Sequence, residues 1–194
     1  FSATMDQGVE LLAKTILRNP IRLIIGHRNQ VTKDVEQQLI FVGQEIGKLY
    51  AFRELIQKGL NIPMLIFVQS KKRGTDLYNE LAFDGINIDV IHSDRTKAQR
   101  DHIIEKFRKG DIYALICTDL MARGIDFKSV NCVLNYDFPQ STANYIHRIG
   151  RTGRADKKGK AYTLCSPDEV AYIDAIQKLI RKTIPVIKGH PYPL

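Results

Sequence analysis

The stretch PMLIFVQSKKRGTDLYNELAFDG (63–85) decides the fold class. Its first six residues form an uninterrupted apolar run, which is typical of a strand that is buried on both faces of a sheet. Residues 72–85 follow with the spacing of an amphipathic helix. A strand buried on both faces and followed by a helix predicts a parallel sheet between two helical layers.

The same alternation continues on both sides of this stretch. It predicts further strands at 35–42, 88–91, 113–117, 132–136 and 160–165, and helices at 45–59, 96–110, 142–149 and from Ser166-Pro167 to Lys182. We therefore expect an α/β fold with a mostly parallel sheet covered by helices on both faces. Ligands of such sheets bind beyond the carboxyl ends of the strands. The candidate site therefore lies in the loops that begin near Gln69, His92, Thr118 and Asp137.

The first residues follow a separate pattern. Apolar residues between Val9 and Leu17 recur at helical spacing, and Asn19-Pro20 ends the predicted helix. A short buried strand is predicted at 21–25, and the polar stretch after it lacks periodicity, which indicates a linker.

Composition sets limits on the function. The chain has 194 residues, of which 44% are hydrophobic and 26% charged, as in an ordinary globular domain. Its net charge of +8 favours a polyanionic partner, and simple solubility is the alternative. No apolar run reaches the roughly 18 residues of a membrane span, so we expect no membrane partner. Cys117, Cys132 and Cys165 lie in apolar runs, which is typical of buried thiols in an intracellular protein.

Two of the candidate loops carry cations at the start of a helix. QSKKRG (69–74) places the Ser70 hydroxyl and three cations where free backbone N–H groups favour an anion. A solvated first turn is the alternative. Arg100 lies in the first turns of the next predicted helix, where an ordinary surface arginine is the alternative.

CTDLMARGID (117–126) is more specific. Asp126 can accept hydrogen bonds from two sugar hydroxyls, while Thr118 and Arg123 can hold backbone phosphates. Alternatively, Thr118 or Asp119 caps a short helix. Capping does not explain an Arg-Gly pair beside Asp126.

YIHRIGRTGR (145–154) carries the strongest signal. Tyr145, Ile146 and Ile149 form a packed stripe, and Gly150 is placed to end the helix. Arg151 and Arg154 then project from a glycine-containing loop. Their planar guanidinium groups suit a phosphoryl group with spread negative charge.

Half of a nucleotide site is missing. No G-x-x-x-x-G-K-[ST] phosphate loop occurs in the sequence, and no carboxylates are set for Mg²⁺. Asp168 and Glu169 follow Ser166-Pro167 and are predicted to complete a helix cap instead.

Taken in order, these motifs resemble those of the DEAD-box RNA helicases. SAT (2–4) is similar to motif III of the family, LIFVQS (65–70) to motif IV, CTD with ARGID to motif V and HRIGRTGR (147–154) to motif VI. The sequence between the motifs looks most like the members that act in ribosome biogenesis. The resemblance implies a RecA-like three-layer sandwich.

The resemblance also implies roles for single residues. Arg151 and Arg154 correspond to arginine fingers that reach the γ-phosphate of ATP, and His147 to a residue that meets motif III across the cleft. The implied sets are Asp126, Gly124, Arg151 and Arg154 for ATP, Ser70, Arg100, Thr118 and Arg123 for RNA, and Ser2, Thr4 and His147 for coupling between domains. Lys97 departs from the family pattern, which often has glutamine there. Arg148 has no equally firm role, and we expect it to be structural.

Domain boundaries and partners follow from the same resemblance. Residues 1–26 are expected to be a remnant of a first RecA-like domain, 27–34 a linker, 35–186 the second RecA-like domain and 187–194 a tail. Implied partners are ATP with Mg²⁺, RNA of the pre-ribosomal kind, the first domain and a regulatory protein, in the nucleus or nucleolus. The alternatives are a stand-alone RNA-binding or protein-docking module and a DNA-directed helicase.

Overall fold

The structure is a computed structural model, and it describes residues 7–21, 34–59, 62–123, 125, 130–153 and 157–190. The chain divides into two compact units, Phe1–Gln30 and Val31–Leu194. None of the described helices is long and apolar enough to cross a membrane.

The described part of the first unit is one helix, α1 (Gln7–Ile16). It confirms the helix predicted from apolar spacing, and Asn19 follows it with a positive φ of 48°. Leu11 and Ile16 are 68% and 69% exposed, so the apolar side of α1 is uncovered in the described chain. The strand predicted at 21–25 lies almost entirely outside the described residues.

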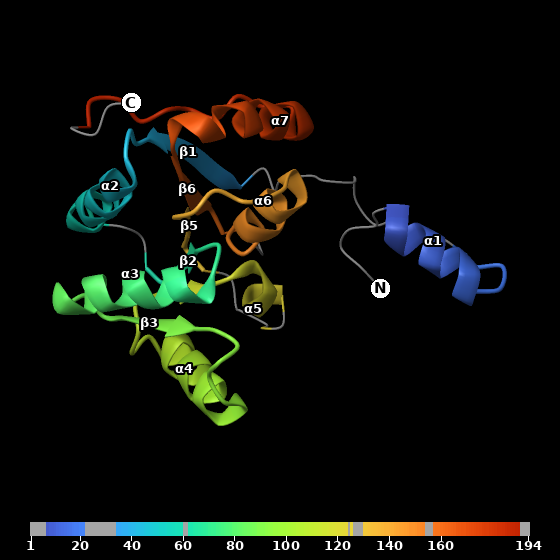
Figure 1. The fold of residues 1–194 in the computed structure, drawn as a ribbon, viewed down its shortest axis with the longest axis horizontal. Coiled ribbons are helices and arrows are strands. Elements are labelled where there is room, and N and C mark those ends of the chain that lie inside the picture. Colours follow the sequence, from blue (N-terminus) through green and yellow to red (C-terminus); the bar gives the residue numbers. More distant parts are fainter. Residues whose placement is uncertain are drawn as a thin grey trace. The chain divides into compact units, whose positions relative to one another are not determined.

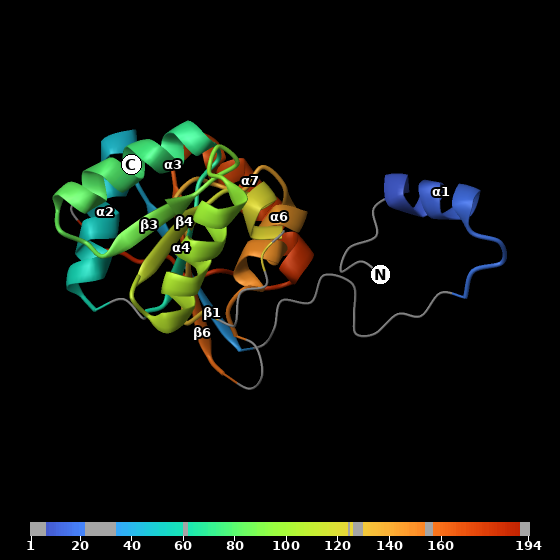
Figure 2. The same cartoon turned by 90° about the horizontal axis from the view of Figure 1, so that it is seen from below.

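The second unit is built on one sheet of six strands (Figures 1 and 2). The strands are β1 (Val35–Phe41), β2 (Met64–Phe67), β3 (Ile88–Ile91), β4 (Ala114–Cys117), β5 (Cys132–Asn135) and β6 (Gly159–Cys165). Their order is β1-β6-β5-β2-β4-β3, and every neighbouring pair is parallel. The mostly parallel sheet of the prediction is thus entirely parallel, and all carboxyl ends of its strands share one edge.

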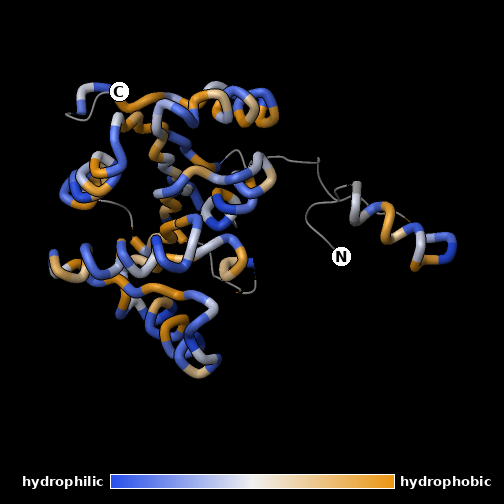
Figure 3. The backbone as a smooth tube through the Cα atoms, in the orientation of Figure 1, coloured by the Kyte–Doolittle hydropathy of each residue, from blue (hydrophilic) through white to orange (hydrophobic). Residues whose placement is uncertain are grey.

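Helices cover both faces of this sheet. The first layer contains α2 (Glu45–Gln57) and α3 (Lys71–Phe83), and the second contains α4 (Lys97–Lys109), α5 (Asp119–Arg123), α6 (Thr142–Ile149) and α7 (Val170–Ile180), as Figure 1 shows. Each layer forms its own apolar core with alternate strand residues. Figure 3 shows orange strands and helices banded in both colours, the hydropathy pattern of a three-layer sandwich.

The ends of the helices follow local sequence signals. Thr96 and Gln99 form a capping box at the start of α4, and Gly110 ends that helix in the left-handed conformation with φ of 85°. Ser166 and Glu169 form a second capping box, which confirms the predicted cap. The final helix is shorter than predicted because a 3₁₀ turn (Pro167–Glu169) precedes α7 and Arg181 ends it.

Two connections fix the loop after α6 and the end of the chain. Thr152 Oγ1 donates a hydrogen bond to the carbonyl of Val130 at 2.5 Å, and a Cβ atom on Gly159 would lie only 2.1 Å from that hydroxyl. At the β1 edge, the Leu39 N–H donates to Pro185 and the Ile187 N–H donates to Leu39. The last described segment therefore continues the hydrogen bonding of the sheet by one short bridge.

Candidate nucleic-acid and nucleotide interface

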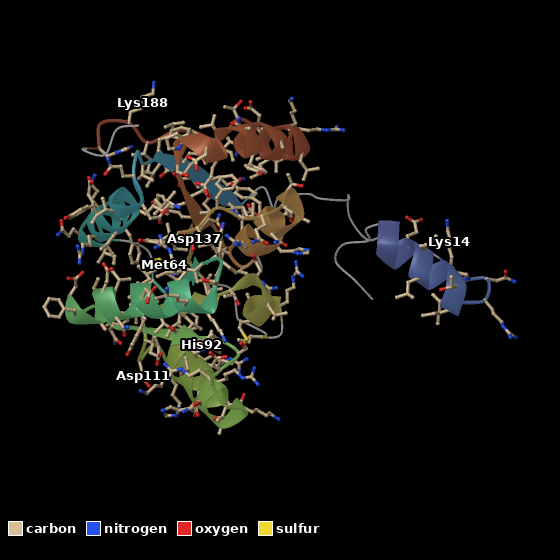
Figure 4. The ribbon with its side chains drawn as sticks, in the orientation of Figure 1. Lys14, Met64, His92, Asp111, Asp137 and Lys188 are labelled. Atoms are coloured by element: carbon tan, nitrogen blue, oxygen red, sulfur yellow. The ribbon has the colours of Figure 1, made fainter. Side chains whose placement is uncertain are left out.

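The four loops singled out from the sequence meet at the carboxyl edge of the sheet. They line a cavity of about 380 Å³ whose walls include Gln69, Ser70, Lys71, His92, Ser93, Thr118, Asp119, Arg123, Gln140, Asn144 and Arg148. The loops follow β2, β3, β4 and β5, and Figure 4 labels His92 after β3 and Asp137 after β5. The parallel sheet thus gathers residues that are far apart in sequence at one edge, as expected for this fold class.

Three of the four residues predicted to contact RNA lie in this cavity: Ser70, Thr118 and Arg123. Ser70 caps α3, and its hydroxyl oxygen accepts a hydrogen bond from the Arg73 N–H at 3.2 Å. Thr118 Oγ1 accepts from the Met121 N–H at 3.5 Å, so the capping alternative for Thr118 holds. Both hydroxyl groups keep a proton to donate, so capping does not prevent a phosphate contact.

Arg100 is not among the residues that line this cavity. It lies in the first turn of α4, where its N–H donates to the Thr96 carbonyl. Lys97 is the first residue of the same helix, directly after the Thr96 cap. The structure therefore leaves the predicted phosphate contacts of Arg100 and Lys97 as predictions.

The three cations of QSKKRG do not act as one anion site. Arg73 forms ion pairs with Asp137, at 3.4 Å, and with Glu45, and its guanidinium lies 5.3 Å from the Tyr136 ring. Lys71 Nζ lies 2.9 Å from Asp94 Oδ1 in an exposed pair. Arg73 is therefore structural, and only the loop's first residues face the cavity.

Asp137 anchors the loop after β2. Its Oδ2 accepts a hydrogen bond from the Gln69 N–H at 2.9 Å, and its Oδ1 lies 3.8 Å from Lys48 Nζ. Lys48 is only 3% exposed and Asp137 only 5%. A buried carboxylate with these partners fixes the backbone next to Ser70.

Arg148 is buried at the centre of the site. Its Nε and Nη2 donate to the two carboxylate oxygens of Asp119, each at 2.8 Å, and its Nη1 donates to the Asp137 carbonyl at 2.7 Å. The guanidinium also lies 5.1 Å from the centre of the Phe67 ring. The structure confirms that Arg148 is structural, and it shows that the Asp119 carboxylate is the anion that balances the charge of Arg148.

Sequence reasoning missed the partner of Arg148. Arg148 follows Tyr145 by three residues and precedes Ile149 by one, so it lies on the buried stripe of α6. A buried arginine needs a paired carboxylate. This helical spacing was the signal that could have shown that Arg148 is buried and paired with a carboxylate, although it does not say which carboxylate.

His147 and Arg151 line a small adjacent hollow, together with Arg123 and Arg148. The pKa of His147 is lowered by burial and by repulsion from Arg123 and Arg151, so its imidazole is held neutral. Its Nδ1 atom is buried without a hydrogen-bond partner among the described residues. A neutral histidine beside two arginines indicates a positive potential that suits an anion.

Five predicted site residues lie outside the described residues: Ser2, Thr4, Gly124, Asp126 and Arg154. Within the described ranges, no three His, Cys, Asp or Glu side chains gather to hold a metal ion. The three cysteines are buried, and burial raises the pKa of each thiol to about 12. This environment confirms the predicted buried thiols, and a raised pKa makes a thiol unreactive at neutral pH.

Comparisons with known proteins identify the family. The helicase conserved C-terminal domain matches residues 47–156, and this range contains the cavity loops. The C-terminal domain of the DEAD-box protein Dbp5 superposes with a TM-score of 0.74 at 33% identity, covering 79% of this chain and 90% of that one. The chain belongs to the DEAD-box helicases, as their carboxy-terminal RecA-like domain.

Two further relatives extend this assignment of the helicase domain. The probable ATP-dependent RNA helicase ddx52 of Dictyostelium discoideum is 57% identical over 94% of this chain and 27% of its own length. Dbp5 of Saccharomyces cerevisiae, bound to RNA and ADP BeF3, superposes with a TM-score of 0.87 at 35% identity, covering 96% of this chain and 50% of that one. The chain spans only 27% of the length of this ddx52 protein and 31% of the length of the probable ATP-dependent RNA helicase DDX52 of Rattus norvegicus.

Proposed function

We propose that this chain is the second half of an ATP-dependent RNA helicase. It holds RNA by its phosphates and completes the ATPase site of a preceding RecA-like domain. One observation carries the proposal: Ser70, Thr118 and Arg123 line one cavity, and Arg123 also lines the adjacent hollow of His147 and Arg151. The residues proposed to bind RNA and those proposed to bind the nucleotide are thus neighbours at one edge of the sheet.

The RNA contacts are proposed to be independent of base sequence. Hydroxyl and guanidinium groups such as those of Thr118 and Arg123 recognise phosphate oxygens, which carry no sequence information. The relative Dbp5 is described with RNA, which supports this substrate class. The backbone of Gln69, next to Ser70, is held by the buried Asp137 carboxylate, so this wall of the cavity is fixed by contacts within the chain.

The nucleotide is proposed to bind between the two domains. Arg123 and Arg151 raise the positive potential beside His147, and this potential favours an anion next to these side chains. Arg151 and Arg154 would reach the γ-phosphate, and Asp126 with Gly124 would hold the ribose side of the nucleotide. Mg²⁺ would be held by the nucleotide and the preceding domain, while Ser2, Thr4 and His147 would couple the two domains.

The biological setting is proposed from the relatives. The resemblance of the sequence between the motifs to the ribosome-biogenesis members of the family supports a role in ribosome biogenesis, acting on pre-ribosomal RNA in the nucleolus. A regulatory protein that acts on domain closure is part of the same proposal. It is supported by a related Dbp5 structure, described as bound to Gle1 and ip6.

Steady-state ATP hydrolysis by the full-length protein tests this function. Arg151→Ala and Arg154→Ala should each lower RNA-stimulated turnover by a factor of about 10³ or more, the usual contribution of an arginine finger. RNA binding should be retained. Arg108→Ala, at an exposed position of α4, is the matched control and should leave turnover unchanged.

Four results would contradict the proposal. Measurable RNA-stimulated turnover by this chain alone would show that it needs no phosphate loop from a second domain. Unchanged turnover in both arginine variants would remove the finger assignment. Equal stimulation by DNA would favour a DNA-directed helicase, and RNA binding without any turnover by the full-length protein would favour a stand-alone RNA-binding module.

A further inference from the structure

Asn144 contacts the site, although none of the sequence motifs includes it. It is the third residue of α6, and its N–H donates to the Oγ of Ser141, the cap of that helix, at 3.1 Å. Its side chain lines the cavity described above. The position of Asn144 is therefore fixed from the backbone side by a helix cap.

The two ends of the Asn144 amide have different partners. The carbonyl oxygen Oδ1 accepts a hydrogen bond from Arg123 Nη2 at 2.7 Å. The amide nitrogen Nδ2 donates to Asp119 Oδ2 at 3.5 Å. A guanidinium can only donate and a carboxylate can only accept, so these partners also fix the orientation of the amide.

Asp119 is itself held by the buried Arg148 through two 2.8 Å hydrogen bonds. A continuous series of polar contacts therefore runs from Arg148 in the core, through Asp119 and Asn144, to Arg123 at the rim of the cavity. Arg148 is 1% exposed, whereas Arg123 is exposed. The rigid end of the series lies in the core and the ligand-facing end lies at the surface.

We propose that Asn144 is a positioning residue that holds the Arg123 guanidinium in place for an RNA phosphate. This inference rests on the proposed function, in which Arg123 contacts RNA. An exposed arginine on the five-residue helix α5 otherwise has many rotamers, and fixing one before binding lowers the entropy lost on binding. One of the five guanidinium N–H donors is used by Asn144, which leaves four for phosphate oxygens.

Asparagine is the residue type that fits both partners. Aspartate would place a second carboxylate beside Asp119 and would neutralise Arg123 by a direct ion pair. Alanine would leave the charge of Arg123 in place but would remove the hydrogen bond that positions its guanidinium. The two substitutions therefore separate the loss of positioning from the loss of positive charge.

The test is a binding titration of fluorescein-labelled oligouridine with the full-length protein, followed by fluorescence anisotropy over a series of salt concentrations. Asn144→Ala should weaken binding about tenfold, the lower end of the value of one hydrogen bond to a charged group, without changing the salt slope. Asn144→Asp should weaken binding more and should reduce the slope of log K against log salt by about 0.7, the loss of one phosphate contact. Asn79→Ala, an exposed asparagine of α3, is the matched control and should bind as wild type does.

A double-mutant cycle with Arg123→Ala decides between positioning and general structure. In the Arg123→Ala background, Asn144→Ala should have no further effect, because its partner is gone. Additive losses, or an Asn144→Ala protein that binds like wild type, would overturn the inference while leaving the RNA contact of Arg123 intact. If Arg123→Ala itself binds like wild type, the proposed RNA role of Arg123 fails instead.

Should Asn144→Ala unfold, the salt slope of Asn144→Asp provides the second readout. An unchanged slope in that variant would overturn the inference, because it would show that the charge of Arg123 remains available to phosphate.

Discussion

Replacing Arg148 with methionine should destabilise the second unit strongly. Methionine retains much of the apolar stem of arginine but leaves Asp119 without its two 2.8 Å hydrogen bonds. Breaking a buried ion pair by removing one partner costs about 3–5 kcal/mol. The Asp119 side chain is 23% exposed, so water screens part of the loss, and we expect a decrease near 3 kcal/mol in the free energy of unfolding.

Urea unfolding of this chain, followed by circular dichroism, measures that decrease. The same change should lower the melting temperature by about 6–12 °C, given the usual 2–4 °C for each kcal/mol in a domain of this size. Arg108→Met, at an exposed position of α4, is the control and should change the free energy of unfolding by less than about 0.5 kcal/mol.

The double variant Asp119→Leu/Arg148→Met provides the sharper comparison. Replacing both partners by apolar groups removes the unpaired carboxylate, so this protein should be more stable than Arg148→Met alone by at least about 1 kcal/mol. An Arg148→Met protein within about 1 kcal/mol of wild type would refute the reasoning. It would mean that the Asp119–Arg148 pair does not hold α5 and α6 together.

Three further predictions concern packing, pH and the thiols. Gly159→Ala should lower the melting temperature in a thermal unfolding scan, because its Cβ would lie 2.1 Å from Thr152 Oγ1. An unchanged melting temperature would show that the loop around Thr152 can move away from the new Cβ without loss of stability. The pKa of His147 is lowered in the folded chain, so as the pH falls the unfolded chain, with an ordinary histidine pKa near 6.5, takes up the proton first. The contribution of His147 to stability is therefore full above about pH 6.5 and is lost as the pH falls through the pKa of the folded state. His147→Asn should therefore lose less stability than wild type between pH 7.5 and 5.5 in urea titrations, and equal losses would contradict this. The three thiols, whose pKa values are raised to about 12, should react with a thiol-specific disulfide reagent only after denaturant is added; rapid reaction of the native chain would contradict their burial.

The sheet and its helices were largely predictable from the sequence. Runs such as 63–68 are apolar without interruption, and Thr96, Gly110 and Ser166 are local signals for helix ends. Such features depend only on residues that are close together in the sequence. The 3₁₀ turn before α7 was not predicted, because its capping residues are also those that begin an α-helix.

The site was predictable only in part. Motif residues indicated which loops line the cavity, and the parallel sheet brings Ser70, Thr118 and Arg123 together as expected. The partner of Arg123 was not predictable, because Asn144 is 21 residues away in the sequence and the two meet only through the fold. For the same reason, the sequence could not show that Arg73 is used internally by Asp137.

The short bridge at the β1 edge has a consequence for the behaviour of the protein at high concentration. An uncovered edge strand offers free backbone groups to the strands of other molecules, and such edges promote aggregation. Here the backbone of Leu39 is occupied by Pro185 and Ile187, and the nearby Ile184 is buried. Removing the residues after Lys182 would uncover this edge, so a shortened protein should precipitate more readily even though its ligand-binding loops are untouched.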